Sequence, residues 1–256
     1  MKLLVKLGGT LLESDQSRAS LARQLTRLCA DGHRLVVVHG GGKRLSRYLG
    51  GLDHKSEFRH GLRVTPPEIM DAVLRVLAGS VNRQLVAELQ GAGARAVGLT
   101  GIDAGTVRAT QLAPDLGLVG KVEHVDPELL DTLTERGFLP AVACIAGGAN
   151  GAIFNVNADQ MAAACGTGLA VDQVVFLTDV GGVLDARGKL IPRLSASGAE
   201  SLIAEGVAKG GMEAKLRAAI SALAGGIKGV SIVNGHEPEI LAQALGGTGV
   251  GSRLSA

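Results

Sequence analysis

Glycines and lysines stand together at several points of this sequence, in patterns suited to binding an anionic group. In VVVHGGGKRL, Gly40, Gly41 and Gly42 follow a hydrophobic run and precede a helix-forming segment, where backbone amides favour an anion. The stretch does not match a Walker A loop, because Arg44 stands where that motif requires Ser or Thr. The dinucleotide pattern G-x-G-x-x-G is also missing, since GAGARA at 91–96 precedes its apolar run instead of following one. We therefore expect a phosphate or carboxylate site that uses neither standard fingerprint.

Two lysines occupy positions that an anion would explain. Lys6 lies inside the apolar run KLLVKL, directly before Gly8 and Gly9, and a lysine in the middle of a buried strand is unfavourable unless it meets an anion. In KGGMEAKLRAAI, Lys215 stands near the start of a predicted helix, where a positive charge opposes the helix dipole. We therefore interpret Lys6 as a cation aimed at a phosphoryl group, and Lys215 as a weaker candidate for the same role.

Polar residues that open a predicted helix form a further group of candidates. FNVNADQMAAACG places Asn155, Asn157 and Asp159 ahead of an alanine-rich helix. One such residue would suffice as an N-cap, and three exceed that need. Arg63, in HGLRVT, follows a glycine in a predicted hairpin and by itself fits a solvated arginine. The six histidines have no metal-binding spacing, His39 at a strand end fits a structural role, and G-x-S-x-G is absent.

The composition describes a globular protein with a large core. Of the 256 residues, 46% are hydrophobic and 20% are charged, and the net charge is +2. No basic stripe suggests nucleic acid, and no apolar run is long enough to cross a membrane. MKLLVKLGG runs into glycines without a cleavage-like segment, so we expect a cytoplasmic protein. Three widely spaced cysteines predict reduced, buried thiols.

Apolar runs alternate with segments of helical period, which predicts a three-layer α/β/α sandwich with a mainly parallel central sheet. The predicted strands span 2–7, 34–39, 94–99, 138–145, 172–180 and 228–234. The predicted helices span 16–31, 43–50, 67–91, 127–136, 157–169, 196–205, 212–225 and 237–245.

Two further segments, 54–64 and 105–125, are predicted hairpins over the strand ends. A boundary near 166–171 divides the chain into an N-terminal lobe, 1–168, and a C-terminal lobe, 169–256. KLGG, VHGGG and DVGG each follow a predicted strand, and the carboxyl ends of parallel strands form the ligand crevice of such sheets. Three glycine loops at one crevice predict a ligand with several anionic groups.

Six motifs together resemble those of a known family. In order and spacing they resemble the motifs of the N-acetylglutamate kinases, which belong to the amino acid kinase family. The six motifs are VKLGGTLL, VVVHGGGKRL, HGLRVTP, FNVNADQMA, LTDVGGVLD and GGMEAKLRAAISAL. The resemblance covers essentially the whole chain; KLGG is common to many members, whereas GLRVTP with NVNADQ is more specific. It implies ATP-dependent phosphorylation of the γ-carboxylate of N-acetyl-L-glutamate, the second step of arginine biosynthesis.

The resemblance also implies a role for each matching residue. Lys6 and Lys215 match the two lysines that stabilise the transferred phosphoryl group. Asp159 matches the carboxylate that holds both lysines in place. The positions matching phosphate contacts are Gly8, Gly9 and Gly41. Those matching contacts to the acceptor substrate are Gly41, Gly42, Arg63 and Asn155. Those matching nucleotide contacts are Thr178, Asp179, Val180, Gly181, Gly182, Val183, Leu184, Val207, Ala208, Lys209 and Gly211. Mg²⁺ would be held mainly by phosphate oxygens and water, so no side-chain metal ligand is expected.

Other activities remain open beside this one. A sister kinase acting on a carrier-linked aminoadipate or glutamate is the nearest, although HGLRVTP argues against it. Uridylate kinase and aspartokinase have the same fold, but neither their first-loop variants nor a C-terminal regulatory domain is found. A non-catalytic amino-acid sensor would retain the pocket, and the presence of Lys6, Asp159 and Lys215 disfavours it.

The segment 67–91 predicts an oligomer. Its apolar residues extend further around the helix than one buried face requires, which often marks an interface. These residues are Met70, Leu74, Leu77, Val81 and Leu85 on one stripe, with Ile69, Val73 and Val76 beside it. By resemblance, arginine-sensitive relatives form hexamers through an additional N-terminal helix, whereas here the first strand begins at Lys2 or Leu3. We therefore expect a homodimer that arginine does not inhibit.

Overall fold

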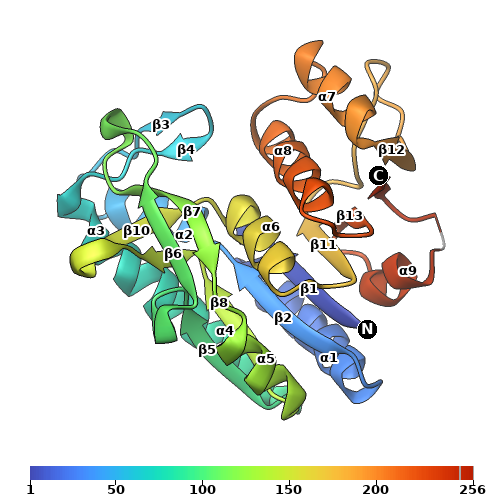
Figure 1. The fold of residues 1–256 in the computed structure, drawn as a ribbon, viewed down its shortest axis with the longest axis horizontal. Helices are drawn as coiled ribbons and strands as arrows, with labels where there is room; N and C mark the ends of the chain where they lie inside the picture. The colour runs from blue at the N-terminus through green and yellow to red at the C-terminus, as the bar shows by residue number, and fades with distance from the viewer. Residues whose placement is uncertain (248, 256) are drawn as a thin grey trace.

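An eight-stranded sheet forms the centre of the computed structural model, which describes residues 1–247 and 249–255 (Figure 1). The strand order is β12-β14-β13-β11-β1-β2-β8-β5, and neighbouring strands are parallel except for β13 and β14. The strands are β1 Lys2–Leu7, β2 Arg34–His39, β5 Ala96–Thr100, β8 Leu139–Ala143, β11 Gln173–Thr178, β12 Arg193–Ser195, β13 Val230–Asn234 and β14 Ser252–Ser255. All six predicted strands are confirmed, and β12 and β14 add a short edge that the sequence did not predict.

Helices cover both faces of this sheet. On one face α1, α4 and α9 contact the strands, and on the other face α5, α6 and α8 do. The helices are α1 Asp15–Ala30, α2 Gly42–Gly50, α3 Pro67–Val73, α4 Asn82–Gly91, α5 Glu128–Glu135, α6 Ala158–Gly168, α7 Ala196–Ala204, α8 Gly210–Ala224 and α9 Ile240–Gly246. Short 3₁₀ turns span Gly9–Leu12, Asp103–Gly105, Pro114–Leu116 and Ala149–Gly151. The predicted three-layer sandwich is confirmed.

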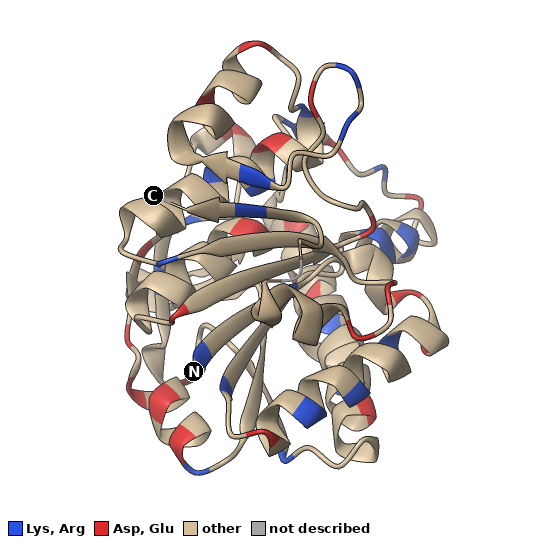
Figure 2. Cartoon of the chain, turned by 90° about the vertical axis from the view of Figure 1, so that its right-hand side faces the viewer, with Lys and Arg blue, Asp and Glu red and all other residues tan. Residues whose placement is uncertain are grey.

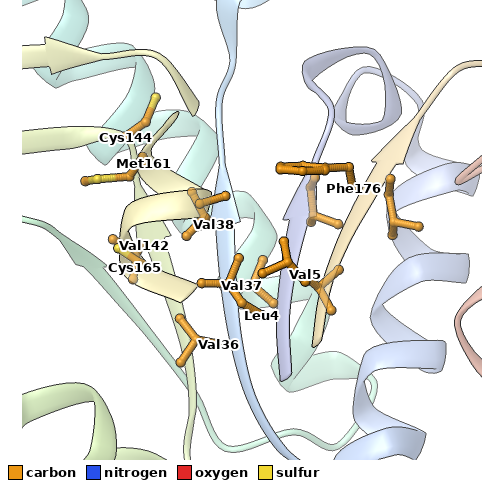
Figure 3. Close-up of a cluster of buried hydrophobic side chains, with 14 of the residues drawn as sticks. Leu4, Val5, Val36, Val37, Val38, Val142, Cys144, Met161, Cys165 and Phe176 are labelled. Atoms are coloured by element: carbon orange, nitrogen blue, oxygen red, sulfur yellow. The ribbon is translucent and has the colours of Figure 1, made fainter. Parts of the chain in front are cut away.

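The core lies between the central strands and these helices. Figure 3 shows buried side chains from neighbouring strands and from α6, among them Leu4 of β1, Val37 of β2, Phe176 of β11 and Met161 of α6. All four side chains are buried, and burying a large apolar side chain contributes about 1.5–3 kcal/mol. Strands that are apolar on both faces therefore fix the middle of the sheet, from which the glycine loops emerge.

The cysteines are free thiols, but their burial differs. Cys144 and Cys165 are buried, as predicted, whereas Cys29 is only half-buried. Burial raises the pKa of Cys29 and of Cys144 to about 11 and that of Cys165 to about 12. All three thiols are therefore protonated at neutral pH.

Both predicted hairpins are present, and one of them belongs to a larger unit. β3 Phe58–Arg59 and β4 Leu62–Arg63 pair antiparallel. β6 Val107–Gln111 and β7 Val119–Val125 also pair, but they join β9 Ile145–Gly147 and β10 Ile153–Val156 in a closed four-stranded barrel. The sequence analysis did not identify β10, because its four residues merge with the polar start of α6. A bridge between Thr65 and Gly117 ties the first hairpin to the barrel.

The segment 67–91 is helical throughout, but it is not a regular α-helix. A π-helical stretch, Leu74–Val81, separates α3 from α4. The predicted surplus of exposed apolar surface is also absent here, because Ile69, Val73 and Val76 are all buried within the chain. These side chains therefore offer no exposed surface to a partner, and the dimer stays a prediction.

Charged side chains of both signs are mixed along the helices and loops on the side shown in Figure 2, while the strands there are mostly uncharged. Across residues 1–247 and 249–255, no helix has both the length and the apolar character needed to cross a bilayer.

Candidate active site

The glycine loops after β1 and β2 meet at the carboxyl edge of the sheet. The Gly8 amide donates to the Leu177 carbonyl of β11 at 2.9 Å. A Cβ placed on Gly9 would lie 3.6 Å from the Gly41 nitrogen and 3.5 Å from the Gly42 nitrogen. The main chains of these loops therefore approach each other closely, as predicted for a single crevice. Gly42 begins α2, so the unpaired amides of a helix start lie at the same edge.

An ion triad of Lys6, Asp159 and Lys215 lies beside these loops. The Lys6 ammonium is 2.7 Å from Oδ1 of Asp159, and the Lys215 ammonium is 3.4 Å from Oδ2. The sheet explains this meeting, because α6 packs across β1 and α8 packs against α6. Asn157 caps α6 by accepting from the amides of Asp159 and Gln160. The three predicted catalytic residues, which are up to 209 positions apart (215 − 6), are thus brought together.

Charge balance keeps the Asp159 carboxylate ionised. Burial opposes its ionisation, but the ammonium groups of Lys6 and Lys215 outweigh that effect, and the pKa of Asp159 lies below its usual 3.8. Lys6 is only 5% exposed, and a buried charge of this kind requires a close partner. Two ammonium groups and one carboxylate leave a net charge of +1, which suits the triad to an anionic ligand.

A small cavity of about 140 Å³ lies beside the glycine loop that follows β2. Arg63 and Asn155 supply polar groups to its wall, and Asn157 joins the wall to the helix that carries Asp159. The Asn155 amide donates to the Thr65 hydroxyl at 3.0 Å. The other lining residues are Gly40, Gly41, Gly42, Leu45, Phe58, Gly61, Leu62, Leu77, Val119, Cys144 and Val156. All four predicted acceptor contacts, Gly41, Gly42, Arg63 and Asn155, line this one cavity.

The Arg63 guanidinium is held in place from several sides. It donates to the Ser56 hydroxyl, to the Gly42 carbonyl at 2.9 Å and to the Ser46 hydroxyl at 2.8 Å. Its carbon centre lies 4.6 Å from the centroid of the Phe58 ring, which stands opposite it across the hairpin. These contacts use three of its five N–H groups. Burial lowers the pKa of Arg63, yet arginine stays charged at neutral pH.

The two predicted nucleotide segments flank the C-terminal half of the sheet. The first follows β11, with Asp179, Val180, Gly181 and Leu184 exposed and Thr178, Gly182 and Val183 buried. The Val183 amide donates to the Ser252 hydroxyl of β14. In the second, Val207 and Ala208 close the turn after α7 through the Leu202 carbonyl, and Lys209 precedes α8. Gly211 contacts the triad, because its carbonyl accepts from the Lys215 ammonium at 3.3 Å.

The chemistry of the crevice offers little to a metal ion held by side chains alone. In the part of the chain that the structure describes, no three His, Cys, Asp or Glu residues form a group that could hold a metal. Asp159 lies within the crevice, but both of its oxygens face ammonium groups.

Several residues of the site were not predicted from the sequence. Phe58 and Ser56 contact the Arg63 guanidinium, and Cys144 lines the cavity. Phe58 carried a weak signal, because it is one of four phenylalanines and stands in the same predicted hairpin as Arg63. Ser56 and Cys144 gave no signal in the sequence, since their roles depend on contacts between distant segments.

Comparisons with known proteins agree with this geometry. The family model described as the amino acid kinase family matches residues 1–234. The chain is 52% identical over 254 residues to an acetylglutamate kinase of Solibacter usitatus, covering 99% of each chain. It is 41% identical over 243 residues to an acetylglutamate kinase of Koribacter versatilis, covering 94% of this chain and 93% of the other. The solved structure of smu.665 from Streptococcus mutans has a TM-score of 0.88 at 26% identity, covering 100% of this chain and 98% of that one.

Proposed function

The chain belongs to the amino acid kinase family, and from this premise we propose that it phosphorylates the γ-carboxylate of N-acetyl-L-glutamate with ATP, a step of arginine biosynthesis. The observation that carries the proposal is the junction at Asn157. This residue lines the cavity that contains Arg63 and also caps the helix that places Asp159 between two lysines. An acceptor held in the cavity therefore has its reactive end beside a cationic cluster.

The acceptor needs no general base. A side-chain carboxylate with an ordinary pKa near 4 is already ionised at neutral pH and is itself the nucleophile. Arg63 suits the α-carboxylate of the substrate, because a guanidinium binds a carboxylate through two parallel hydrogen bonds. Asn155 supports the same end of the molecule. The γ-carboxylate then points toward Gly41 and the triad.

The remaining difficulty is bringing one anion against another. An oxygen of the γ-carboxylate attacks the terminal phosphorus of ATP in line, and the bond from that phosphorus to the bridging oxygen breaks. Lys6 and Lys215 neutralise the charge that spreads over the transferred phosphoryl group, and the amides of Gly9 and Gly41 donate to its oxygens. The Gly8 amide, expected to do the same, already donates to the Leu177 carbonyl. Asp159 keeps both ammonium groups at the point of transfer and does not react.

We assign acceptor binding to residues 1–168 and nucleotide binding to residues 169–256. The segments 178–184 and 207–211 surround the nucleotide, with the exposed apolar residues Val180 and Leu184 suited to an adenine ring. Mg²⁺ would be held mainly by the ATP phosphates and water and would neutralise part of their charge, whereas Asp159 stays with its lysines. We further propose a cytoplasmic homodimer that arginine does not inhibit; light scattering that finds another assembly would contradict the dimer.

A coupled assay of ADP release tests the activity. Purified protein is supplied with MgATP and, in turn, N-acetylglutamate, glutamate, aspartate, UMP and carbamate. We expect turnover with N-acetylglutamate that exceeds turnover with each of the others. Release of ADP with none of these acceptors would favour a non-catalytic sensor, and a preference for UMP or aspartate would assign a different kinase activity.

A further inference from the structure

The last residue of β2, His39, has no part in the steps above, yet it is fully buried beside the glycine loop. Its Nδ1 lies 2.8 Å from the Gly40 carbonyl oxygen, and its Nε2 lies 2.9 Å from Nδ2 of Asn82. Asn82 is also fully buried and opens α4 directly after the π-helical stretch. A chain of buried polar groups therefore connects α4 to the first residue of the glycine loop.

The proton positions along this chain follow from Arg83. A guanidinium only donates, and that of Arg83 donates to Oδ1 of Asn82. The opposite amide orientation would bring two donors face to face, so Nδ2 of Asn82 must point the other way, where it donates to the Ala141 carbonyl at 2.8 Å and to Nε2 of His39. Since Nε2 accepts, the proton of a neutral imidazole is on Nδ1, and Nδ1–H donates to Gly40.

The surroundings keep this ring neutral. Burial lowers the pKa of His39 to about 4; its bond to the Gly40 carbonyl raises the pKa, and the charge of Arg83 lowers it. At neutral pH the imidazole therefore has one acceptor nitrogen and one donor nitrogen. The acceptor faces Asn82, which leaves the donor for the glycine loop.

The direction of one carbonyl sets the direction of the next amide. In a planar trans peptide the C=O and the following N–H point in opposite directions. Holding the Gly40 carbonyl against His39 therefore turns the Gly41 N–H away from the ring, and Gly41 is one of the residues that line the cavity. Leu77 and Val81 of the π-helical stretch restrain Gly41 as well, because a Cβ there would lie 2.7 and 3.1 Å from their methyl carbons.

We propose that His39 and Asn82 are positioning residues for phosphoryl transfer: Asn82 fixes the Nδ1–H tautomer, and the imidazole holds the Gly40 carbonyl so that the Gly41 amide points at the transferred phosphoryl group. This role rests on the proposed kinase function. Neither side chain touches a substrate; both act through the main chain of the glycine loop. If the Gly40 carbonyl is released, the peptide between Gly40 and Gly41 rotates. The Gly41 amide then no longer points at the phosphoryl group in the transition state.

The tautomer is measured directly in the wild-type protein. Long-range ¹H–¹⁵N NMR of protein labelled with ¹⁵N-histidine distinguishes the two tautomers and the imidazolium, and loss of one signal in a His39→Asn variant assigns the resonance. We expect a protonated Nδ1 and an unprotonated Nε2 at neutral pH. A proton on Nε2, alone or on both nitrogens, overturns the proposal without the need for any folded variant.

A matched pair of substitutions separates the two hydrogen bonds of the ring. In His39→Asn the side-chain amide takes the place of Nδ1 and still donates to Gly40. In His39→Gln the longer side chain reaches Asn82 but offers Gly40 no donor. Both variants remove the ring and cost similar packing, so their difference reports on the bond to Gly40.

We expect His39→Gln to lower kcat about tenfold or more with little change in the KM for ATP, and His39→Asn to lower it by about threefold at most. Equal losses in the two variants, or a defect confined to the KM values, would show a merely structural role. A wild-type protein that is inactive on N-acetylglutamate would instead refute the proposed function. An active wild type with the other tautomer would refute only this inference.

Discussion

At the scale of single residues, the crevice depends on a charge balance that no one residue supplies. Lys6 is buried at the end of a strand, and its charge is tolerated because Asp159 lies 2.7 Å away. Lys215 shares that carboxylate from the opposite side at 3.4 Å. One carboxylate between two ammonium groups leaves positive charge for a ligand. Removing either lysine therefore has a different effect from removing the aspartate.

Loss of the Lys6 ammonium is expected to slow the chemical step. Lys6→Met keeps an unbranched apolar stem in the strand and removes the charge. We expect kcat to fall by about two to three orders of magnitude, with the KM for ATP nearly unchanged, because such donors act mainly on the transition state. Lys228→Met is the control, since that side chain is 81% exposed and pairs with Asp172 at 3.7 Å. A Lys6→Met enzyme as fast as the control would remove Lys6 from the mechanism.

The Asp159 carboxylate should also make stability depend on pH. Its folded pKa lies below its usual 3.8, although burial acts against this, because Lys6 and Lys215 favour the charged form. A carboxylate whose pKa is lowered on folding stabilises the protein above its unfolded pKa, and this contribution is lost as the pH falls through the folded value. The free energy of unfolding of the wild type minus that of Asp159→Asn should therefore be constant from neutral pH down to about 5 and then decrease. A difference that grows on acidification would mean the opposite shift.

At the scale of elements, the hairpin β3–β4 carries Arg63, to which we assign recognition of the acceptor. Arg63 points into the cavity, whereas Arg59 on the paired strand points outward to Glu57 and Asp115. Two arginines on one hairpin thus face different environments. The hairpin provides its own control for a test of recognition.

Arg63→Lys is expected to raise the KM for N-acetylglutamate about tenfold or more while the KM for ATP stays nearly constant, since a lysine cannot reproduce the bidentate fork. Steady-state kinetics with each substrate varied in turn measure both constants. Arg59→Lys should leave both unchanged, because its 44% exposed side chain makes only surface ion pairs. An increase confined to ATP would assign Arg63 to the nucleotide instead.

The sequence predicts elements well where hydrophobic period alone decides them. The six apolar runs became strands because side chains buried on both faces leave no polar alternation to misread. The π-helical stretch Leu74–Val81 escaped prediction, because its apolar residues continue the helical period and its widening shows only in the hydrogen bonding. The edge strand β12 and its neighbour β14 are three and four residues long and carry arginines and serines. Their pairing is set by neighbours distant in sequence.

The candidate site was predictable to a similar degree. The type of Lys6 was informative, since a lysine inside an apolar strand is costly without a partner, whereas Asp159 and Lys215 gave weaker signals. The partner that each of these residues contacts could not be predicted, because the contact depends on α6 crossing β1 and on α8 packing against α6. His39 illustrates the limit, since a histidine at a strand end gives no sign that Asn82 will fix its tautomer.

At the scale of the whole molecule, one sheet connects two lobes. β1 lies in the middle, pairing with β2 on the side of the N-terminal lobe and with β11 on the side of the C-terminal lobe. The ion triad crosses the same boundary, because Asp159 belongs to one lobe and Lys215 to the other. In the assignment that we propose, the binding contacts lie apart in the two lobes, whereas the charges that act on the transferred group lie where the lobes join.

This arrangement predicts that binding defects in the two lobes are independent. Leu184, which is 49% exposed beyond β11, should cover the nucleotide, so Leu184→Ala should raise the KM for ATP about fivefold, as expected for burying the exposed half of a leucine. The KM for N-acetylglutamate should stay constant. In the double variant with Arg63→Lys, each KM should match that of the corresponding single variant within about twofold, because sites without shared partners are additive. Leu52→Ala is the control, since Leu52 is 61% exposed and belongs to the other lobe. If Leu184→Ala weakened both substrates equally, or if the double variant departed from additivity, the assignment of one substrate to each lobe would fail.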